Sequence, residues 1–106
     1  MAETGGSSLY SCRNCRNPLA YAEDLLSKTF KAKSGAAYMF YHAMNVVIGR
    51  REDKLLITGN FSIAPVYCSK CGVELGWKYI QAYERSQWYK EGNFILEKLK
   101  IIEEFA

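Results

Sequence analysis

The chain has 106 residues, which is the length of one domain and leaves no room for a second independent core. Apolar residues make up 49% of the sequence and aromatic residues 14%, a composition that excludes disorder and favours a globular fold. The net charge of +3 does not demand nucleic acid, because dedicated nucleic-acid-binding proteins concentrate their basic residues far more.

The start of the chain predicts neither a secretory signal nor a membrane anchor. Residues 1–8 (MAETGGSS) are small and polar, and they lack the apolar stretch of a signal peptide. We expect them to form a flexible tail before a single domain at residues 9–106. No apolar run approaches the length that spans a bilayer. We therefore expect a soluble intracellular protein, in which cysteines are seldom kept as structural disulfides.

Aromatic and β-branched segments predict a series of strands through the middle of the chain. Turn signals at Ser34-Gly35 and at residues 49–53 (GRRED) separate some of them. Pro65 favours an edge strand or a bulge for the segment that contains it. The predicted strands are AAYMFY (36–41), NVVIG (45–49), KLLITG (54–59), NFSIAPVYC (60–68) and LGWKYIQAY (75–83).

The C-terminal segment NFILEKLKIIEEF (93–105) fits two periodicities, and the polar ERSQWYKEG (84–92) before it resembles a turn. Phe94 and Leu96 alternate as in a strand, whereas other apolar residues of the segment share a helical face. We expect a strand over 93–98 with Phe94 and Leu96 inward, and the remainder stays open. Closely spaced strands without amphipathic helices favour a mainly β, mostly antiparallel domain over an α/β fold.

The four cysteines of the chain form two CxxC motifs, CRNC and CSKC. Tetrahedral zinc needs four inward-pointing soft ligands, and two tight CxxC turns supply them. The residue after the second cysteine often needs a positive φ; Gly72 meets this need, and Asn17 is expected to help in the other turn. We predict one structural Zn²⁺ per chain, with the ligands Cys12, Cys15, Cys68 and Cys71.

Redox and disulfide roles for these motifs fit less well. A thioredoxin-type CxxC needs a βαβ context, and paired disulfides need an oxidising compartment. The two motifs lie too far apart for a common zinc finger, so the metal would clip the N-terminal part of the domain to its middle. Four thiolates carry excess negative charge, which Arg13, Arg16 and Lys70 would offset.

The sequence assembles no catalytic group. A zinc with four thiolate ligands has no open position at which to activate water. All four cysteines are used as ligands, so no thiol is left as a nucleophile. His42 is the only histidine, and a lone histidine beside an apolar stretch is more often a packing or surface residue than a base. We therefore predict that the protein is not an enzyme.

With the motifs placed, residues 9–100 resemble the Yippee family. The shared segments are the first CxxC, DLLSKTF, SGAAYMF, NVVIG, LITG, the second CxxC, LGWKY and YKEG, of which the last two are specific. The resemblance implies a β-tent, as in the thalidomide-binding domain of cereblon: two antiparallel sheets that lean together, with zinc held by the same four cysteines near the apex. B-type methionine sulfoxide reductases and the C-terminal domains of cytosolic RNA sensors are more distantly similar.

The resemblance also implies what the protein does. Family members are linked to the nucleus, to mitotic structures and to a large ubiquitin ligase, and no enzymatic activity is established for them. We expect a zinc-binding interaction module of the nucleus or cytoplasm, serving as adaptor or subunit of a larger assembly such as a ubiquitin ligase complex.

An RNA- or DNA-binding β-tent is the alternative, and it would use the basic residues Lys31, Lys33, Arg50, Arg51 and Lys54. The small net charge disfavours it. A reductase would need a cysteine beyond the zinc ligands.

An aromatic pocket is the candidate binding surface. Cereblon-like relatives use the tryptophan and the aromatic residue of a G-W-K-aromatic stretch as two walls of a ligand cage. By motif these are Trp77 and Tyr79, which share one face of a strand. Phe61 is the first candidate for a further wall, with Phe40 and Tyr38 as others. The pocket would hold a partner's loop or a small ligand; the competing interpretation is that these rings are ordinary core.

The chain departs from the usual Yippee pattern at three positions. Phe61 and Pro18 stand where the family often has histidine, and Pro65 stands where it usually has aspartate. Roles that depend on those polar groups therefore do not carry over by motif.

Overall fold

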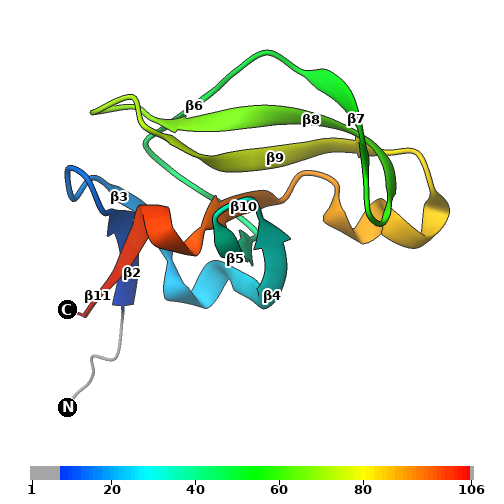
Figure 1. Ribbon diagram of the computed structural model, residues 1–106. Coiled ribbons are helices and arrows are strands. Elements are labelled where there is room, and N and C mark those ends of the chain that lie inside the picture. The colour runs from blue at the N-terminus through cyan, green and yellow to red at the C-terminus, as the bar shows by residue number, and fades with distance from the viewer. Residues whose placement is uncertain (1–7, 106) are drawn as a thin grey trace.

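The structure of the protein is a computed structural model that describes residues 8–105 (Figure 1). Residues 1–7, which hold nearly all of the predicted tail, and residue 106 lie outside the described residues. Short 3₁₀ helices are η1 (Ala22–Asp24), η2 (Arg85–Lys90) and η3 (Lys98–Lys100). The strands are β2 (Ser8–Cys12), β3 (Pro18–Tyr21), β4 (Leu25–Ala32), β5 (Gly35–Phe40), β6 (Val46–Ile48), β7 (Glu52–Leu56), β8 (Gly59–Cys68), β9 (Glu74–Ala82), β10 (Phe94–Glu97) and β11 (Ile101–Phe105).

The strands form two antiparallel sheets, which confirms the predicted fold class. The larger sheet has the order β4-β5-β10-β9-β8-β6, and β7 also pairs with β8. The smaller sheet has the order β11-β2-β3, so the two ends of the described chain are paired with each other. Figure 1 shows the smaller sheet at one end of the molecule, where the turns β2–β3 and β8–β9 also lie. Within residues 8–105, no helix is long and apolar enough to cross a membrane.

Most strands were predictable from composition. The predicted strands of residues 36–83 correspond to β5, β6, β7, β8 and β9, and the predicted strand at 93–98 corresponds to β10. The segment left open after it forms η3 and β11. No prediction was made for β2, β3 or β4. The last of these lies at the edge of the sheet, where half of its residues are exposed, none is fully buried, and its register with β5 shifts twice. Its sequence therefore lacks a regular apolar alternation.

Pro65 lies at a local gap in the edge of β8. One long side of β8 pairs with β9, while the other is shared between β7, opposite Gly59–Ile63, and β6, opposite Val66–Cys68. Pro65 falls between these two partners, where the sheet requires no N–H donor. Its carbonyl oxygen still accepts a hydrogen bond of 2.8 Å from the N–H of Gly49. The strand β8 is therefore not an edge strand as expected, and Pro65 is accommodated at a local gap between its two partners on one side.

Apolar side chains form two clusters, on opposite faces of the larger sheet. The first includes Tyr10 and Leu19 from the smaller sheet's strands and Phe94 and Leu96 from β10. The second includes Phe61, Tyr79 and Ile95. Strand β10 is buried on both faces, because consecutive residues enter different clusters. Phe94 and Leu96 point inward as predicted, and so does Ile95, which explains the mixed periodicity of this segment.

A close approach between β9 and β10 requires a glycine before Trp77. A Cβ atom at Gly76 would overlap the carbonyl oxygen of Ile95. Any larger residue would push these two strands apart. The glycine of the LGWKY segment therefore has a packing role, and it allows the tryptophan strand to lie directly against the central strand β10.

We expect Leu96→Ala to lower the free energy of unfolding by about 2–5 kcal/mol, because it opens a cavity in the first cluster. Leu99→Ala is the matched control, since Leu99 lies three residues further on in η3 with 59% of its surface exposed. The control should change stability by less than about 0.5 kcal/mol. Urea denaturation of the zinc-loaded proteins gives both values. Equal effects of the two substitutions would contradict the burial of β10.

Candidate functional site

The four cysteines converge on one point between the two sheets. All four Sγ atoms lie within 4.8 Å of one another. The Sγ atoms of Cys12 and Cys71 are 3.7 Å apart, and those of Cys15 and Cys68 are 3.5 Å apart. A tetrahedral zinc with Zn–S bonds of about 2.3 Å requires sulfur–sulfur distances of about 3.8 Å, so the donor set fits zinc. Each close pair takes one cysteine from each motif, as expected for a single shared ion.

The two CxxC turns have the same backbone hydrogen bonds. In the first, the N–H of Arg16 donates to the carbonyl of Cys12 at 2.7 Å. In the second, the N–H of Gly72 donates to the carbonyl of Cys68 at 2.9 Å. The donor residue has a positive φ in both turns, 66° at Arg16 and 81° at Gly72. The expected role of Gly72 is confirmed, whereas Arg16 and not Asn17 fills this position in the first turn, because the turn places it directly after the second cysteine.

Asn17 instead connects the two turns through its buried side chain. Its Nδ2 donates to the Sγ of Cys68 at 3.3 Å and to the carbonyl of Asn45 at 3.2 Å, and it also reaches Ser69 Oγ at 3.4 Å. The same Asn45 carbonyl accepts the N–H of Ser69 at 3.0 Å. Partners of this kind around a metal orient its ligands and tune their basicity. Sequence reasoning missed this role, since the contacts join residues far apart in the chain.

Hydrogen bonds prepare Cys68 to act as a thiolate. Burial raises the pKa of its thiol, but hydrogen bonds from the Cys71 N–H, the Asn17 side chain and the Lys70 N–H together lower that pKa to about 6. Donors directed at a sulfur favour its charged form, which is the form that binds metal. Within the cluster these donors favour the charged form at Cys68, whereas burial raises the pKa of the Cys12 and Cys15 thiols.

The two arginines near the first turn bind to the C-terminal part of the chain. Arg13 donates through its guanidinium to the carbonyls of Leu99 at 3.1 Å and Ile101 at 2.9 Å. Arg16 pairs with Glu104 at 2.7 Å. These contacts attach η3 and β11 to the metal-binding turn, and the offset of the thiolate charge by these arginines stays a prediction.

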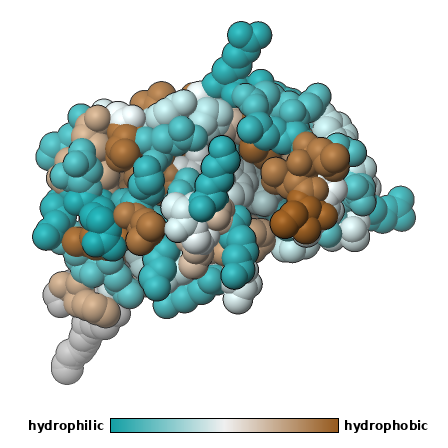
Figure 2. Space-filling view, viewed as in Figure 1, coloured by the Kyte–Doolittle hydropathy of each residue, from teal (hydrophilic) through white to brown (hydrophobic). Residues whose placement is uncertain are grey.

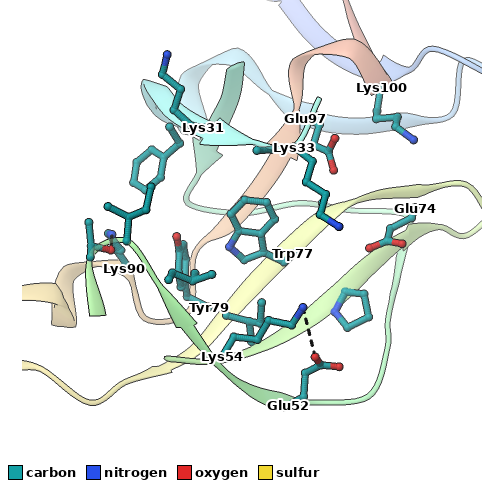
Figure 3. A pocket seen from close by; sticks show the side chains of 18 of the residues that line it. Lys31, Lys33, Glu52, Lys54, Glu74, Trp77, Tyr79, Lys90, Glu97 and Lys100 are labelled. Carbon is teal, nitrogen blue, oxygen red and sulfur yellow. Dashed lines mark hydrogen bonds and ion pairs between the residues drawn. The ribbon is translucent and has the colours of Figure 1, made fainter. Parts of the chain in front are cut away.

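A groove of about 1080 Å³ opens on the face of the larger sheet that carries the second apolar cluster (Figure 3). Strands β8 and β9 form its floor. Strand β4 and the turn after it form one wall, and β7 with the turn that follows forms the other. The C-terminal end of η2 contributes at one end. The twist of the sheet therefore brings its opposite edges to one surface.

The candidate aromatic residues take different places around this groove. Trp77 and Tyr79 both line it, with ring centroids 6.1 Å apart and planes at 79°. Phe61 is fully buried against Tyr79, at 5.0 Å between centroids, and does not line the groove. Phe40 and Tyr38 belong to the first cluster, on the other face of the sheet. The groove therefore exposes part of Trp77, whereas Tyr79, with 2% of its surface exposed, is buried in the second cluster together with Phe61.

The indole N–H of Trp77 is buried and has no acceptor within the described part of the chain. Burial raises the pKa of Tyr79, and the neighbouring Trp77 N–H offsets part of that rise. An unpaired donor of this kind has an energetic cost, so the floor of the groove contains a polar group that gains nothing from the fold itself.

Lys90 is a buried residue of the groove that sequence reasoning did not single out. Only 3% of its surface is exposed, and its Nζ donates to Thr58 Oγ1 at 2.9 Å. The rings of Phe61 and Tyr79 lie 5.0 and 5.5 Å from the same Nζ. Phe30 and Tyr89 complete the surrounding rings. Burial lowers the pKa of Lys90. Lysine is almost never fully buried, so nothing in YKEG predicted this position.

The sequence model of the family described as "Yippee zinc-binding/DNA-binding /Mis18, centromere assembly" matches residues 8–103. The chain belongs to the Yippee/Mis18 family. A yippee-like protein of Arabidopsis thaliana is 55% identical over 96 residues, covering 91% of each chain. The yippee-like 3 protein of Danio rerio is 48% identical over 95 residues, covering 90% of this chain and 80% of its own.

A solved structure shares the fold of this Yippee/Mis18 chain. The crystal structure of the Mis18 "Yippee-like" domain matches with a TM-score of 0.74 at 12% sequence identity, covering 94% of this chain and 97% of that domain. At this identity the likeness concerns the fold alone. The zinc-binding family and the cluster of four cysteines together show that the chain binds one zinc ion.

We expect one zinc per chain, and we expect Cys→Ser at any ligand position to unfold or aggregate the domain. The reason is that metal binding supplies part of the free energy of folding. Elemental analysis and circular dichroism of the purified variants test this. A folded protein without zinc, or four cysteines that titrate as free thiols under native conditions, would contradict it.

Asn17→Ala should weaken zinc binding roughly 10- to 100-fold while leaving all four ligands in place, because it removes the donor to Cys68 Sγ. Asn60→Ala, at an exposed position in β8, is the control and should bind zinc like the wild type. Competition with a chromogenic chelator measures both affinities. If Asn17→Ala releases zinc no more readily than Asn60→Ala, the Asn17 contact is not part of the metal site.

Proposed function

We propose that this Yippee/Mis18 protein is a non-catalytic interaction module that binds a protein partner in the groove of Trp77 and Tyr79. The observation that carries the proposal is the groove itself, in which the half-buried Trp77 remains partly open beside the buried ring of Tyr79. Concave surfaces that combine aromatic side chains with charged or polar groups that fix the orientation of a ligand are the usual form of binding sites. Zinc supports this role by fixing the turn from which the tryptophan strand begins.

The chemistry of the chain supports a non-catalytic role. Four thiolates complete a tetrahedral zinc, which leaves no coordination position for water or substrate. The cysteines are all in that cluster, so the chain has no further thiol to act as a nucleophile. His42 is exposed and does not line the groove.

Within the cell, we propose that the module acts as an adaptor or subunit of a larger assembly, such as a ubiquitin ligase complex, in the nucleus or cytoplasm. This proposal rests on the resemblance to Yippee proteins. The matched family description names centromere assembly, which is likewise a process of multi-protein complexes. A small domain with one aromatic groove suits such a role, since it can present a single segment of one partner to the rest of an assembly.

Nucleic-acid binding is the second candidate, and the family description, which includes DNA binding, favours it. The basic residues expected to carry it are partly used within the fold. Arg51 donates to Ser62 Oγ at 2.6 Å and to Gln81 Oε1 at 3.0 Å, and Lys54 pairs with Glu52 at 3.6 Å. Titration of labelled single- and double-stranded oligonucleotides at low and moderate salt tests this candidate; absence of salt-dependent binding would eliminate it.

We expect Trp77→Ala to abolish capture of the native partner while the domain stays folded and zinc-loaded. Trp88→Ala is the matched control, because Trp88 is 52% exposed in η2 and does not line the groove. Affinity purification of tagged wild type and both variants, followed by mass spectrometry, gives the comparison. If Trp77→Ala unfolds the protein or keeps the partner, Trp77 is ordinary core and the groove is not the binding surface.

A further inference from the structure

Lys90 and Thr58 together form a polarised hydroxyl at one end of the groove. An ammonium group has no acceptor, so the bond of 2.9 Å runs from Lys90 Nζ to Thr58 Oγ1. The hydroxyl hydrogen of Thr58 is then free to donate to another group. Thr58 is exposed and lines the groove, so its donor is accessible from solvent. A neighbouring buried cation strengthens such a donor.

The charge of Lys90 is not neutralised by the fold. No carboxylate forms a salt bridge with it among residues 8–105. Aromatic rings stabilise the ammonium through their negative faces, but they carry no net charge. The buried cation therefore gives this end of the groove a positive potential, which water screens less than it screens a surface lysine.

The rest of the groove carries charge of both signs, arranged along its length. Its lining includes five lysines and three glutamates. Figure 3 shows Lys90 at one end and Glu74 at the other, with Trp77 between them. Lys31 and Lys33 extend from the β4 wall, and both are exposed. An occupant must therefore present negative charge at the Lys90 end and not along its whole length.

Apolar side chains border the same end of the groove. Ile57 precedes Thr58 in the turn after β7 and is fully exposed, and Leu55 is 76% exposed. Figure 2 shows apolar side chains gathered over this turn. Tyr89, beside Lys90, is also exposed and lines the groove. Large apolar residues at an exposed rim are typical of surfaces that bind proteins.

We propose that the groove binds an extended acidic peptide segment of a protein partner, one of whose carboxylates accepts a hydrogen bond from the Thr58 hydroxyl in front of Lys90. An apolar side chain of the same segment lies over Trp77. This inference rests on the proposed function, since it names the chemistry of the partner. A nucleic-acid strand fits less well, because its evenly spaced phosphates would meet Glu52, Glu74 and Glu97 along the groove.

The test uses the ¹⁵N-labelled, zinc-loaded full chain and a blocked peptide of sequence Ac-GEDLALG-NH₂, whose acidic residues lie at one end. Matched probes are the peptide with glutamine and asparagine in place of its acids, and a single-stranded oligothymidylate. The indole N–H signals of the two tryptophans report binding, and Trp88→Phe assigns them. We expect the acidic peptide to shift the Trp77 signal and to bind at least roughly tenfold more tightly than the neutral one, a difference equivalent to one charged hydrogen bond.

Two pairs of variants locate the carboxylate. Thr58→Val should lose the preference for the acidic peptide, while Thr58→Ser, which keeps the hydroxyl, should retain it. Lys90→Met keeps the apolar stem and should also lose the preference, whereas Lys98→Met, at an exposed lysine outside the groove lining, should not. If Lys90→Met fails to fold, the Thr58 pair decides the question, because that residue is exposed.

Several outcomes would overturn the inference. They are equal affinity for the acidic and neutral peptides, binding of the oligonucleotide in place of the peptide, and equal behaviour of Thr58→Val and Thr58→Ser. The outcome for the proposed function can be distinguished from the outcome for this inference. If no acidic preference is found but Trp77→Ala still loses the native partner, the groove is a protein-binding surface with a different specificity.

Discussion

The zinc–thiolate cluster is the constraint on which the arrangement of this chain depends. It joins the turn between β2 and β3, in the smaller sheet, to the turn between β8 and β9, in the larger one. Strand β11 pairs with β2, and Arg13 donates to the carbonyls of Leu99, just before β11, and of Ile101, its first residue. The C-terminal part of the chain is therefore held to the metal-binding turn as well. The free energy of metal binding is therefore used to hold two sheets together, and a small domain gains an anchor that its apolar clusters alone would not supply.

The same constraint positions the groove on the other face of the sheet. Strand β8 ends in Cys68, and β9 begins shortly after the second metal-binding turn. Along β8, Val66 and Cys68 face the first cluster, while Ile63 and Pro65 line the groove. Alternation across a strand means that a displacement of the metal-binding turn would also displace the floor of the groove. The metal site and the groove are therefore built from one pair of strands.

The features that could be predicted from the sequence are those that depend on a short motif or on the composition of one segment. Four cysteines in two CxxC motifs specify their own geometry, and the aromatic and β-branched strands of the larger sheet follow from composition. Sequence reasoning missed β4, an edge strand whose mixed polarity reflects one exposed side, and it assigned the positive φ of the first turn to Asn17 in place of Arg16. The contacts of Asn17 and the burial of Lys90 were out of reach, because both depend on partners brought together only by the tertiary fold.

The burial of Lys90 is better explained by the charge that it gives the groove than by a contribution to the stability of the fold. Removing an ammonium from water costs several kcal/mol, and the lowered pKa of Lys90 indicates that the surrounding rings and the Thr58 hydroxyl offset only part of this cost. An apolar residue of similar length would fill the same space without that cost, since replacing buried charges by packed apolar groups is often neutral or stabilising. What the apolar residue could not supply is a positive potential at the end of an aromatic groove. The unpaired Trp77 N–H is of the same kind, because each is a polar group that the fold itself leaves without a full complement of partners. Both residues belong to the lining of one groove, and Thr58, which accepts the hydrogen bond from Lys90, gives that end of the groove a polar group that solvent can reach.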